Sequence, residues 1–487
     1  MTTPMMLALY TPAAAPFLAA LLALVLPSRI AVWTGLLAAV AVLASGVTLT
    51  TTDATLSVSG ALGLLRADAL TAWMLLTIGA VAVIACAAAP GYLHHEAAHH
   101  RRYLTLIQLF LACMSLAVLS GNLGLLWVAL EATTIVTAFL VGHRRTRESV
   151  EAAWKYVVLC SVGIAIAFLG IVCLYAASVA SGGDGITALN WSHLAAAAPS
   201  LDPALTKLAT GLILLGFGTK AGLAPMHAWL PDAHSQAPAP VSALMSGVLL
   251  SVAFYAILRY RPIADAALGP AYVRTFLLTA ALASLVVAAM LLIAQRDYKR
   301  LLAYSSIEHM GLIALGTAFG VRIAIAAVLL HILGHGLVKS VAFCASGQVL
   351  HVTGSPDIAA VRALAARQPG LAGAFGISLV ALLGLPPFSL FASELGVARA
   401  GFASGHGWAV AVAFTLMLVA FVAIARHGAR MLLGPPAAQS TAPPPSVHRG
   451  RGLVFLGIGL TTTAVLGLYL GPLTDVLDAA AAVAGGH

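Results

Sequence analysis

Charged residues are scarce in this 487-residue chain: Asp, Glu, Lys and Arg together make up 8% of it, against about 25% in a soluble domain. Hydrophobic residues make up 61%, and the mean hydropathy is +0.99. This composition excludes a soluble globular protein and a soluble protein held by a single membrane anchor. We therefore expect an integral membrane protein with many spans.

The chain also lacks paired cysteine motifs. No CxxC or CxxCH pair occurs, which argues against an iron–sulfur cluster or a c-type haem in this chain. Any redox centres are therefore expected in partner subunits. The first 26 residues lack a basic segment and a cleavage site, so we interpret them as the first span rather than as a signal peptide. The five cysteines lie scattered in apolar segments: Cys86, Cys113, Cys160, Cys173 and Cys344.

Long apolar segments recur along the whole chain, each near the roughly 20 residues that a helix needs to cross a bilayer. Strand-like alternation is absent, so the sequence predicts an all-α membrane protein with about fourteen transmembrane helices. The predicted spans are 5–26, 30–52, 68–90, 102–120, 122–142, 153–179, 205–224, 238–260, 272–294, 301–320, 323–351, 369–391, 407–432 and 451–475.

The net charge of +9 is explained by membrane topology rather than by nucleic acid. Most Lys and Arg residues lie on loops that follow odd-numbered spans. By the positive-inside rule these loops face the cytoplasm, so both termini are expected on the outer face of a prokaryotic-type inner membrane.

Two loop segments carry further signals. His94, His95, His99 and His100 cluster after the third span, where both a metal site and a solvated loop fit the spacing. The segment 434–450 is rich in Pro and Ala and is expected to be an extended cytoplasmic linker.

Five charged residues sit in stretches that are expected to be buried in the bilayer: Glu131, Lys155, Lys220, Lys339 and Glu394. Each costs roughly 2.5–3.5 kcal/mol near the bilayer centre. A chain that accepts this cost repeatedly is expected to provide a route for protons or small cations. Two alternatives stay open: Glu131 could form a static ion pair between helices, and Lys155, one turn into its span, could extend to the interface.

Lys220 and Glu394 each accompany a segment rich in Gly and Pro, which predicts two broken helices. Interrupted segments in matching positions indicate inverted repeats. We expect helices 1–3 in residues 1–101, a first five-helix repeat in 102–260, a second in 261–432, and a linker with helix 14 in 433–487.

His331, His335 and Lys339 follow one another at i, i+4 spacing and therefore share one face of a predicted helix. Histidine titrates near neutrality and serves as a proton relay, so this line predicts a relay. Glu308 and His309 either extend the polar path or lie at its cytoplasmic mouth.

The sequence around these residues resembles the antiporter-like membrane subunits of respiratory complex I, multisubunit cation/proton antiporters and membrane-bound hydrogenases. The resemblance is carried by Pro225 to His234 (PMHAWLPDAH), by 239–244 (APVSAL), by Lys299 to Ser306 (KRLLAYSS) and by His335 to Lys339. It extends over about residues 65–432. The stretches AAWKY, LPDAHS and SSIEHMG make the hydrogenase-4 component F branch the most similar.

The resemblance implies roles for individual residues. Glu131 and Lys220 would form a coupling ion pair, Lys339 with the two histidines a central relay, and Glu394 the exit. Complex I-type members carry a histidine on helix 8 that is missing here, so water, Ser246 or His234 would have to connect Lys220 with Lys339.

The implied function is that of a proton-translocating membrane subunit of a respiratory or hydrogenase-type oxidoreductase complex. This chain would carry no cofactor, and nickel–iron and iron–sulfur centres would reside in a peripheral redox module. Other membrane subunits would be its neighbours. The alternatives are a subunit of a Na⁺(cation)/proton antiporter without a redox partner, and a membrane scaffold whose charges form static ion pairs.

Overall fold

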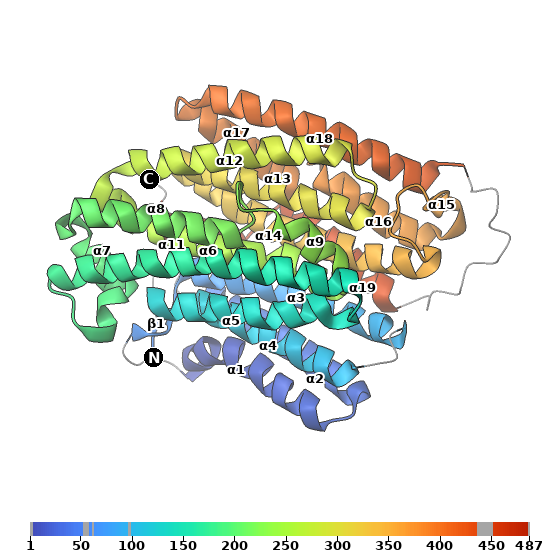
Figure 1. Ribbon diagram of the computed structural model, residues 1–487, viewed down its shortest axis with the longest axis horizontal. Coiled ribbons are helices and arrows are strands. Elements are labelled where there is room, and N and C mark those ends of the chain that lie inside the picture. The colour runs from blue at the N-terminus through green and yellow to red at the C-terminus, as the bar shows by residue number, and fades with distance from the viewer. Residues whose placement is uncertain (1–2, 52–57, 61–62, 96–98, 436–450, 486–487) are drawn as a thin grey trace.

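The computed structural model describes residues 3–51, 58–60, 63–95, 99–435 and 451–485, which are mostly helical. The helices run side by side along the long axis of the molecule (Figure 1). The predicted linker 434–450 lies almost entirely outside the described residues, as does part of the histidine-rich loop.

The first helices are long and nearly continuous. They are α1 (Thr3–Val25), α2 (Ser28–Thr51), α3 (Ala69–His95), α4 (His100–Leu119), α5 (Leu123–Val141) and α6 (Arg147–Ala180). The middle of the chain is more interrupted, with α7 (Trp191–Ala197), α8 (Pro203–Lys220), α9 (Trp229–Gln236), α10 (Ala239–Leu244), a π-helical turn (Met245–Leu249) and α11 (Leu250–Leu268).

The remaining helices are α12 (Pro270–Ile293), α13 (Tyr298–Phe319), α14 (Arg322–Thr353), α15 (Leu364–Arg367), α16 (Pro369–Leu382), α17 (Ser389–Ala403), α18 (Gly407–Leu433), α19 (Arg451–Leu468) and α20 (Leu473–Val483). The all-helical prediction missed a short antiparallel sheet of β1 (Val58–Ser59) and β2 (Arg66–Ala67). Two-residue strands give no detectable alternation in a sequence.

Among the described residues, ten helices are long and apolar enough to cross a membrane, or eleven when α19 and α20, bent by 79°, count as one span. The predicted spans 205–224, 301–320 and 369–391 correspond to α8, α13 and α16, which are not among the ten. These shorter or more polar helices belong to the segments that carry or precede the predicted site residues.

Helix α14 occupies the centre of the bundle and packs against α3, α10, α13, α16 and α17 (Figure 1). Nearly nine tenths of its apolar stretch is buried, and that of α10–α11 is completely buried. The outer helices α1, α2, α6, α12 and α18 instead expose large apolar side chains. Because lipid is as apolar as these side chains, the buried centre is where polar groups can gather.

Two helix pairs are separated by short non-helical segments. One lies between Lys220, where α8 ends, and α9; the other lies between α16 and α17. Gly222 and Gly384 have positive φ values of 78° and 62° in these segments, a conformation that L side chains rarely adopt. A Cβ at Gly384 would collide with the carboxylate of Glu394, so the second break brings its backbone directly against that side chain.

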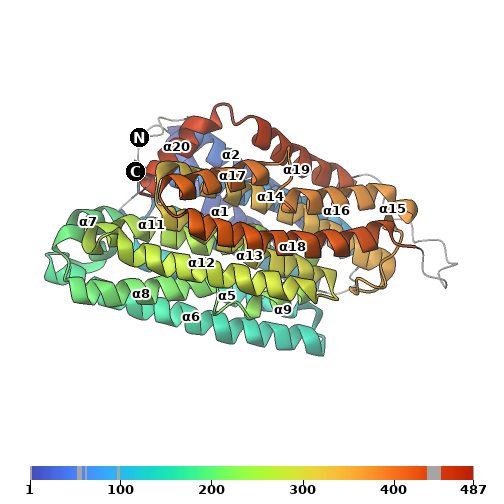
Figure 2. The same cartoon turned by 90° about the horizontal axis from the view of Figure 1, so that it is seen from above.

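The two chain ends lie at the same end of the bundle, together with α7 and β1 (Figures 1 and 2). The short helix α15 lies at the opposite end in both views. The segment with α7, which follows the predicted span 153–179, and the segment with α15, which follows the predicted span 323–351, thus lie at opposite ends of the bundle.

Candidate functional site

Three buried histidines meet at the centre of the bundle. His309 comes from α13, and His331 and His335 come from α14. The Nδ1 atom of His309 lies 3.1 Å from Nε2 of His331, and its ring centroid lies 5.0 Å from that of His335. The rings of His331 and His335 are nearly parallel, with centroids 6.4 Å apart. Sequence spacing predicted the two α14 histidines on one face, and α13 supplies the third between them.

The cluster continues to α17 through a hydroxyl group. Nδ1 of His331 lies 2.8 Å from Oγ of Ser393, and Glu394 follows Ser393 in the same buried turn. The structure therefore joins the histidine cluster to Ser393, which the sequence did not single out and which is the sequence neighbour of Glu394. A serine gives no signal of its own, because it is common on helix–helix contacts.

Lys339 lies at the other side of the cluster and is completely buried. Its Nζ donates to the backbone oxygen of Leu302 at 2.7 Å and to Oγ of Ser305. The carboxyl group of Glu308 lies close enough to act on Lys339 through its charge. Glu308 and His309 are both buried in the interior of the bundle.

Several polar atoms of the cluster have no hydrogen-bond partner among the described residues: Nε2 of His309, both ring nitrogens of His335 and Oε2 of Glu308. A buried polar atom left unpaired costs about 1–3 kcal/mol. A cluster selected only for stability would be expected to pair these atoms. A neutral imidazole carries one donor and one acceptor, so adjacent rings can pass a proton from one to the next.

The π-helical turn lies beside this cluster. Oγ of Ser246, within the turn, is 2.7 Å from Oγ of Ser306 on α13. Gly247 and Gly336 face each other so closely that a Cβ on either would lie within 2.9 Å of the backbone oxygen of the other. In the region where complex I-type members carry the helix-8 histidine, this chain therefore has a serine pair that joins α13 to the π-helical turn.

Lys220 forms a second buried site between α5, α6 and α8. Its Nζ donates to Oγ1 of Thr134 at 2.5 Å and to the hydroxyl of Tyr156 at 3.1 Å, and lies 5.4 Å from the centre of the Tyr156 ring. The expected ion pair with Glu131 is not formed in this structure, and two hydroxyl groups accept from the ammonium group instead. Glu131 still acts on Lys220 through its charge, and its Oε2 has no hydrogen-bond partner among the described residues.

His234 lies on α9, where it is completely buried. Its ring packs against Trp229 and Phe343, with centroids 6.1 and 5.6 Å apart. Both of its ring nitrogens lack a hydrogen-bond partner within the described part of the chain. Its contact with Phe343 brings it to α14, the helix of Lys339, as a connecting residue requires.

Lys155 differs from the other candidates because its side chain is 49% exposed. Its Nζ lies 2.7 Å from Oε1 of Glu151 and 3.1 Å from Oδ2 of Asp232. Arg300 also bonds to Asp232. Lys155 therefore extends to the surface, as long side chains near helix ends do, and lies outside the buried contacts.

A buried lysine was missed by the sequence prediction. Lys299 opens α13 and was counted as a loop residue, but its Nζ donates to the backbone oxygens of Ser235 and Ala237 at 2.7 and 2.8 Å. It thereby satisfies carbonyl groups at the end of α9, which holds His234. Lys299 belongs to the charged stretch 296–300, just before the predicted span 301–320, and a residue there is ordinarily expected to be exposed.

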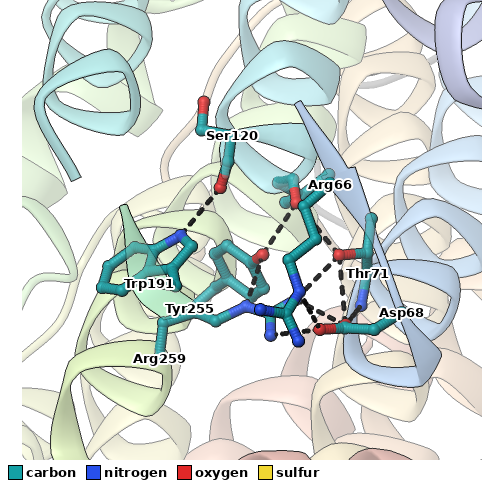
Figure 3. Close-up of polar contacts among 8 residues, drawn as sticks. Arg66, Asp68, Thr71, Ser120, Trp191, Tyr255 and Arg259 are labelled. Atoms are coloured by element: carbon teal, nitrogen blue, oxygen red, sulfur yellow. Dashed lines mark hydrogen bonds and ion pairs between the residues drawn. The ribbon is translucent and has the colours of Figure 1, made fainter. Parts of the chain in front are cut away.

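A buried ion pair at the end of the bundle that holds β1 and α7 was also missed. Figure 3 shows the guanidinium group of Arg259 facing the carboxylate of Asp68, with two bonds of 2.6 and 2.5 Å. Arg259 also donates to Thr71 and Tyr255. Burial disfavours the charged carboxylate of Asp68, but the charge and hydrogen bonds of Arg259 outweigh it and lower the pKa of Asp68 to about 2.

The described residues contain no group of three or more His, Cys, Asp or Glu side chains that could hold a metal ion. Residues 96–98 and the side chains of His94 and His95 lie outside the described part, so the metal alternative for that loop is not tested.

Comparison with known proteins gives one family and several similar proteins. The transmembrane family described as NADH:quinone oxidoreductase/Mrp antiporter matches residues 120–420. A relative named hydrogenase-4 component F homolog, from Methylacidiphilum infernorum, is 42% identical over 303 residues, which are 62% of this chain and 64% of that protein. The chain thus spans less than two thirds of that relative's length.

Two solved structures share the fold over nearly the whole chain. A chain of the Mrp complex from Dietzia sp. DQ12-45-1b is 24% identical with a TM-score of 0.85, covering 99% of this chain and 97% of that one. A chain of respiratory complex I from Thermus thermophilus is 26% identical with a TM-score of 0.76, covering 97% of this chain and 99% of that one.

Proposed function

Because this chain belongs to the NADH:quinone oxidoreductase/Mrp antiporter transmembrane family, we propose that it is a proton-translocating membrane subunit of an oxidoreductase complex. Electron transfer would take place in partner subunits. The chain itself would move protons through buried Glu, Lys and His side chains.

One observation carries this proposal: the contacts from His335 through His309 and His331 to Ser393, beside Glu394. These side chains come from three different helices and lie in the interior of a membrane bundle. Between successive side chains of this series, a proton could pass directly or after one imidazole ring reorients. Lys339 would deliver protons to this cluster, and Glu394 would release them.

Lys220 and Glu131 would form the switch at the other half of the path. Two unit charges about 4 Å apart attract by roughly 4 kcal/mol at an effective dielectric of 20. Here Lys220 bonds to Thr134 and Tyr156 instead. We assign this arrangement to the separated state of the switch and the ion pair to the other state. A redox event in a partner would select between them and so drive a proton toward His234 and Lys339.

The proposal includes fourteen membrane spans in two inverted repeats. Ten of these spans are the candidate spans described above, and the bent pair α19–α20 is the eleventh. The other three are α8 with α9, α13, and α16 with α17. The repeats would comprise 102–260 and 261–432, after three helices in 1–101 and before a linker and final helix in 433–487. Both termini would face outward from a prokaryotic-type inner membrane, with the end that holds α15 in the cytoplasm.

The partners would be other membrane subunits and a peripheral redox module. The name of the relative in Methylacidiphilum infernorum supports a module of the hydrogenase type, with nickel–iron and iron–sulfur centres. The alternative is a Na⁺(cation)/proton antiporter that works with similar subunits and no redox partner. Similarity to the Mrp complex chain is below 25% identity, so it bears on the fold alone.

Purification of the tagged full chain from its native membranes, with mass spectrometry of the copurifying proteins, tests the class of complex. A nickel–iron hydrogenase large subunit with iron–sulfur proteins is the expected result. Other antiporter-type subunits without any redox protein would contradict the proposal and assign the chain to the cation exchangers.

Proton movement is tested with the same complex in proteoliposomes, using a pH-sensitive dye and the electron donor of the copurified enzyme. Lys339→Met should abolish the dye response while electron transfer and assembly persist. The matched control is Lys207→Met, because Lys207 is exposed on α8. Normal proton movement in assembled Lys339→Met complex would refute the proposed path.

A further inference from the structure

A small cavity opens at the end of the bundle that holds α15, and arginine side chains dominate its lining. Its volume is about 100 Å³. Arg296 comes from the turn between α12 and α13, Arg362 from the segment before α15, and Arg430 from the last turns of α18. We call these three residues and the space between them the arginine cavity.

Among the described residues, the lining of the arginine cavity carries more positive than negative charge. Within the described residues, none of the three arginines forms an ion pair. Asp357 is the one acidic residue of the lining, and its carboxylate already accepts the backbone N–H of Ala359 at 2.9 Å. Three guanidinium groups that converge beside one carboxylate favour the binding of an anion.

A buried histidine supplies a second, independent indication. His427 lines the same cavity and is 7% exposed. Its Nε2 makes a long contact of 3.4 Å with the backbone oxygen of Ile293, whereas its Nδ1 is buried and has no hydrogen-bond partner in the described part of the chain. An unpaired buried nitrogen costs about 1–3 kcal/mol, so this side chain at the cavity wall has a hydrogen-bonding capacity that the described residues do not use.

The surroundings of the cavity select the kind of anion. Helices α12 and α18 pack side by side and lead from the cavity along the outer face of the bundle (Figures 1 and 2). Both expose large apolar side chains on the way, among them Met290 at 69% and Val422 at 57%. A ligand with an anionic head and long apolar chains fits a basic cavity that continues into an exposed apolar face. The cavity is too small for a folded protein segment.

We propose that the arginine cavity binds the phosphate-bearing headgroup of an anionic phospholipid, whose acyl chains lie along α12 and α18. Basic pockets between transmembrane helices on the cytoplasmic side are suited to such headgroups. Phosphate oxygens would accept from the three guanidinium groups. The bound lipid would fasten the end of α18 to the turn before α13, and so to the helix that carries His309.

The test measures thermal stabilisation of the full chain in detergent micelles as phosphatidylglycerol is added. The wild-type chain should be stabilised by phosphatidylglycerol and not by phosphatidylcholine. An arginine near an anionic headgroup contributes about a fivefold increase in affinity. Replacement of Arg296, Arg362 and Arg430 by Gln should therefore raise the phosphatidylglycerol concentration needed for a given stabilisation about 100-fold. The single Arg430→Gln, exposed at the end of α18, should raise it about fivefold.

The matched control replaces three other exposed arginines, Arg101, Arg102 and Arg147, by Gln, and should respond as the wild type does. An equal loss in this control would refute the site, because it would show attraction to the general surface charge. Stabilisation by inorganic phosphate alone at the same concentrations would refute a lipid ligand.

A photo-reactive amino acid at position 430 separates a lipid from a partner protein in the assembled complex. Cross-linking to phospholipid is the expected result. Cross-linking to an acidic segment of a partner subunit in place of lipid would overturn the proposal.

Discussion

Removal of the buried carboxylate of Asp68 should destabilise the protein strongly without changing its transport chemistry. Asp68 and Arg259 are separated by 191 positions and join the start of α3 to α11. In Asp68→Ala, Nη1 of Arg259 loses its partner and Nη2 retains only Thr71. Leaving one member of a buried ion pair unpaired costs about 3–5 kcal/mol.

The lowered pKa of Asp68 gives a second, smaller value for the stabilisation that this carboxylate provides. Lowering from 3.8 to about 2 corresponds to roughly 2 kcal/mol of stabilisation at 1.36 kcal/mol per pH unit. Since the folded-state pKa is lowered, this stabilisation is present above about pH 4 and is lost as the pH falls toward 2. The value is below the deletion cost because it compares only the two protonation states of Asp68, whereas deletion also leaves Arg259 unpaired.

The assay is the thermal transition of the full chain in detergent, followed by size-exclusion chromatography. At about 2 cal/mol/K of unfolding entropy per residue, a loss of 3–5 kcal/mol lowers the midpoint of a chain of this length by roughly 3–5 °C. Asp68→Asn keeps one acceptor oxygen and should fall between the wild type and Asp68→Ala.

The double variant Asp68→Leu/Arg259→Met supplies the control. It should recover part of the lost stability, because replacing both members of a buried pair by apolar residues is often neutral, whereas Arg66 and the backbone N–H of Thr71 still lose Asp68 as a partner. Thr71 and Tyr255 would each keep the backbone oxygen of Val118 as a partner. A single variant as stable as the wild type, or a double variant no better than the single, would refute the reasoning.

Three further outcomes are expected for the site. His309→Gln should lower proton movement in proteoliposomes on the order of a hundredfold, since a positioned proton-transfer group is removed, while the thermal midpoint stays near that of wild type; unchanged proton movement would exclude His309 from the path. Ser393→Ala removes the hydroxyl at 2.8 Å from His331 and should slow transport in the same dye assay, with Ser393→Thr restoring it; equal rates in both variants would count against a hydrogen-bonding role. Lys155→Ala should change the thermal midpoint by about 1 °C or less and leave proton movement intact, because exposed ion pairs contribute roughly 0–1 kcal/mol; a large transport defect would instead give Lys155 a direct role.

The sequence predicted those features that depend on local geometry. Helix positions followed from apolar length, and the common face of His331 and His335 followed from their i, i+4 spacing. The resemblance carried by short motifs such as PMHAWLPDAH is confirmed by the family match over residues 120–420.

Features that depend on packing between distant segments were not predictable. His309 enters the cluster because α13 packs on α14, and Lys220 bonds to hydroxyl groups of α5 and α6 rather than to Glu131. Asp68 and Lys299 lie beside predicted span ends, where exposure is the ordinary expectation. Only the fold brings their partners to them.

The π-helical turn at Met245–Leu249 has a consequence for assigning helix faces from the sequence. Its i+5 hydrogen bond, from the N–H of Leu250 to the oxygen of Met245, adds one residue to the turn. One residue rotates a helix by about 100°, so the faces of α10 and α11 are out of phase. Side chains assigned to the polar face from a single helical wheel would be misassigned in one half of this span.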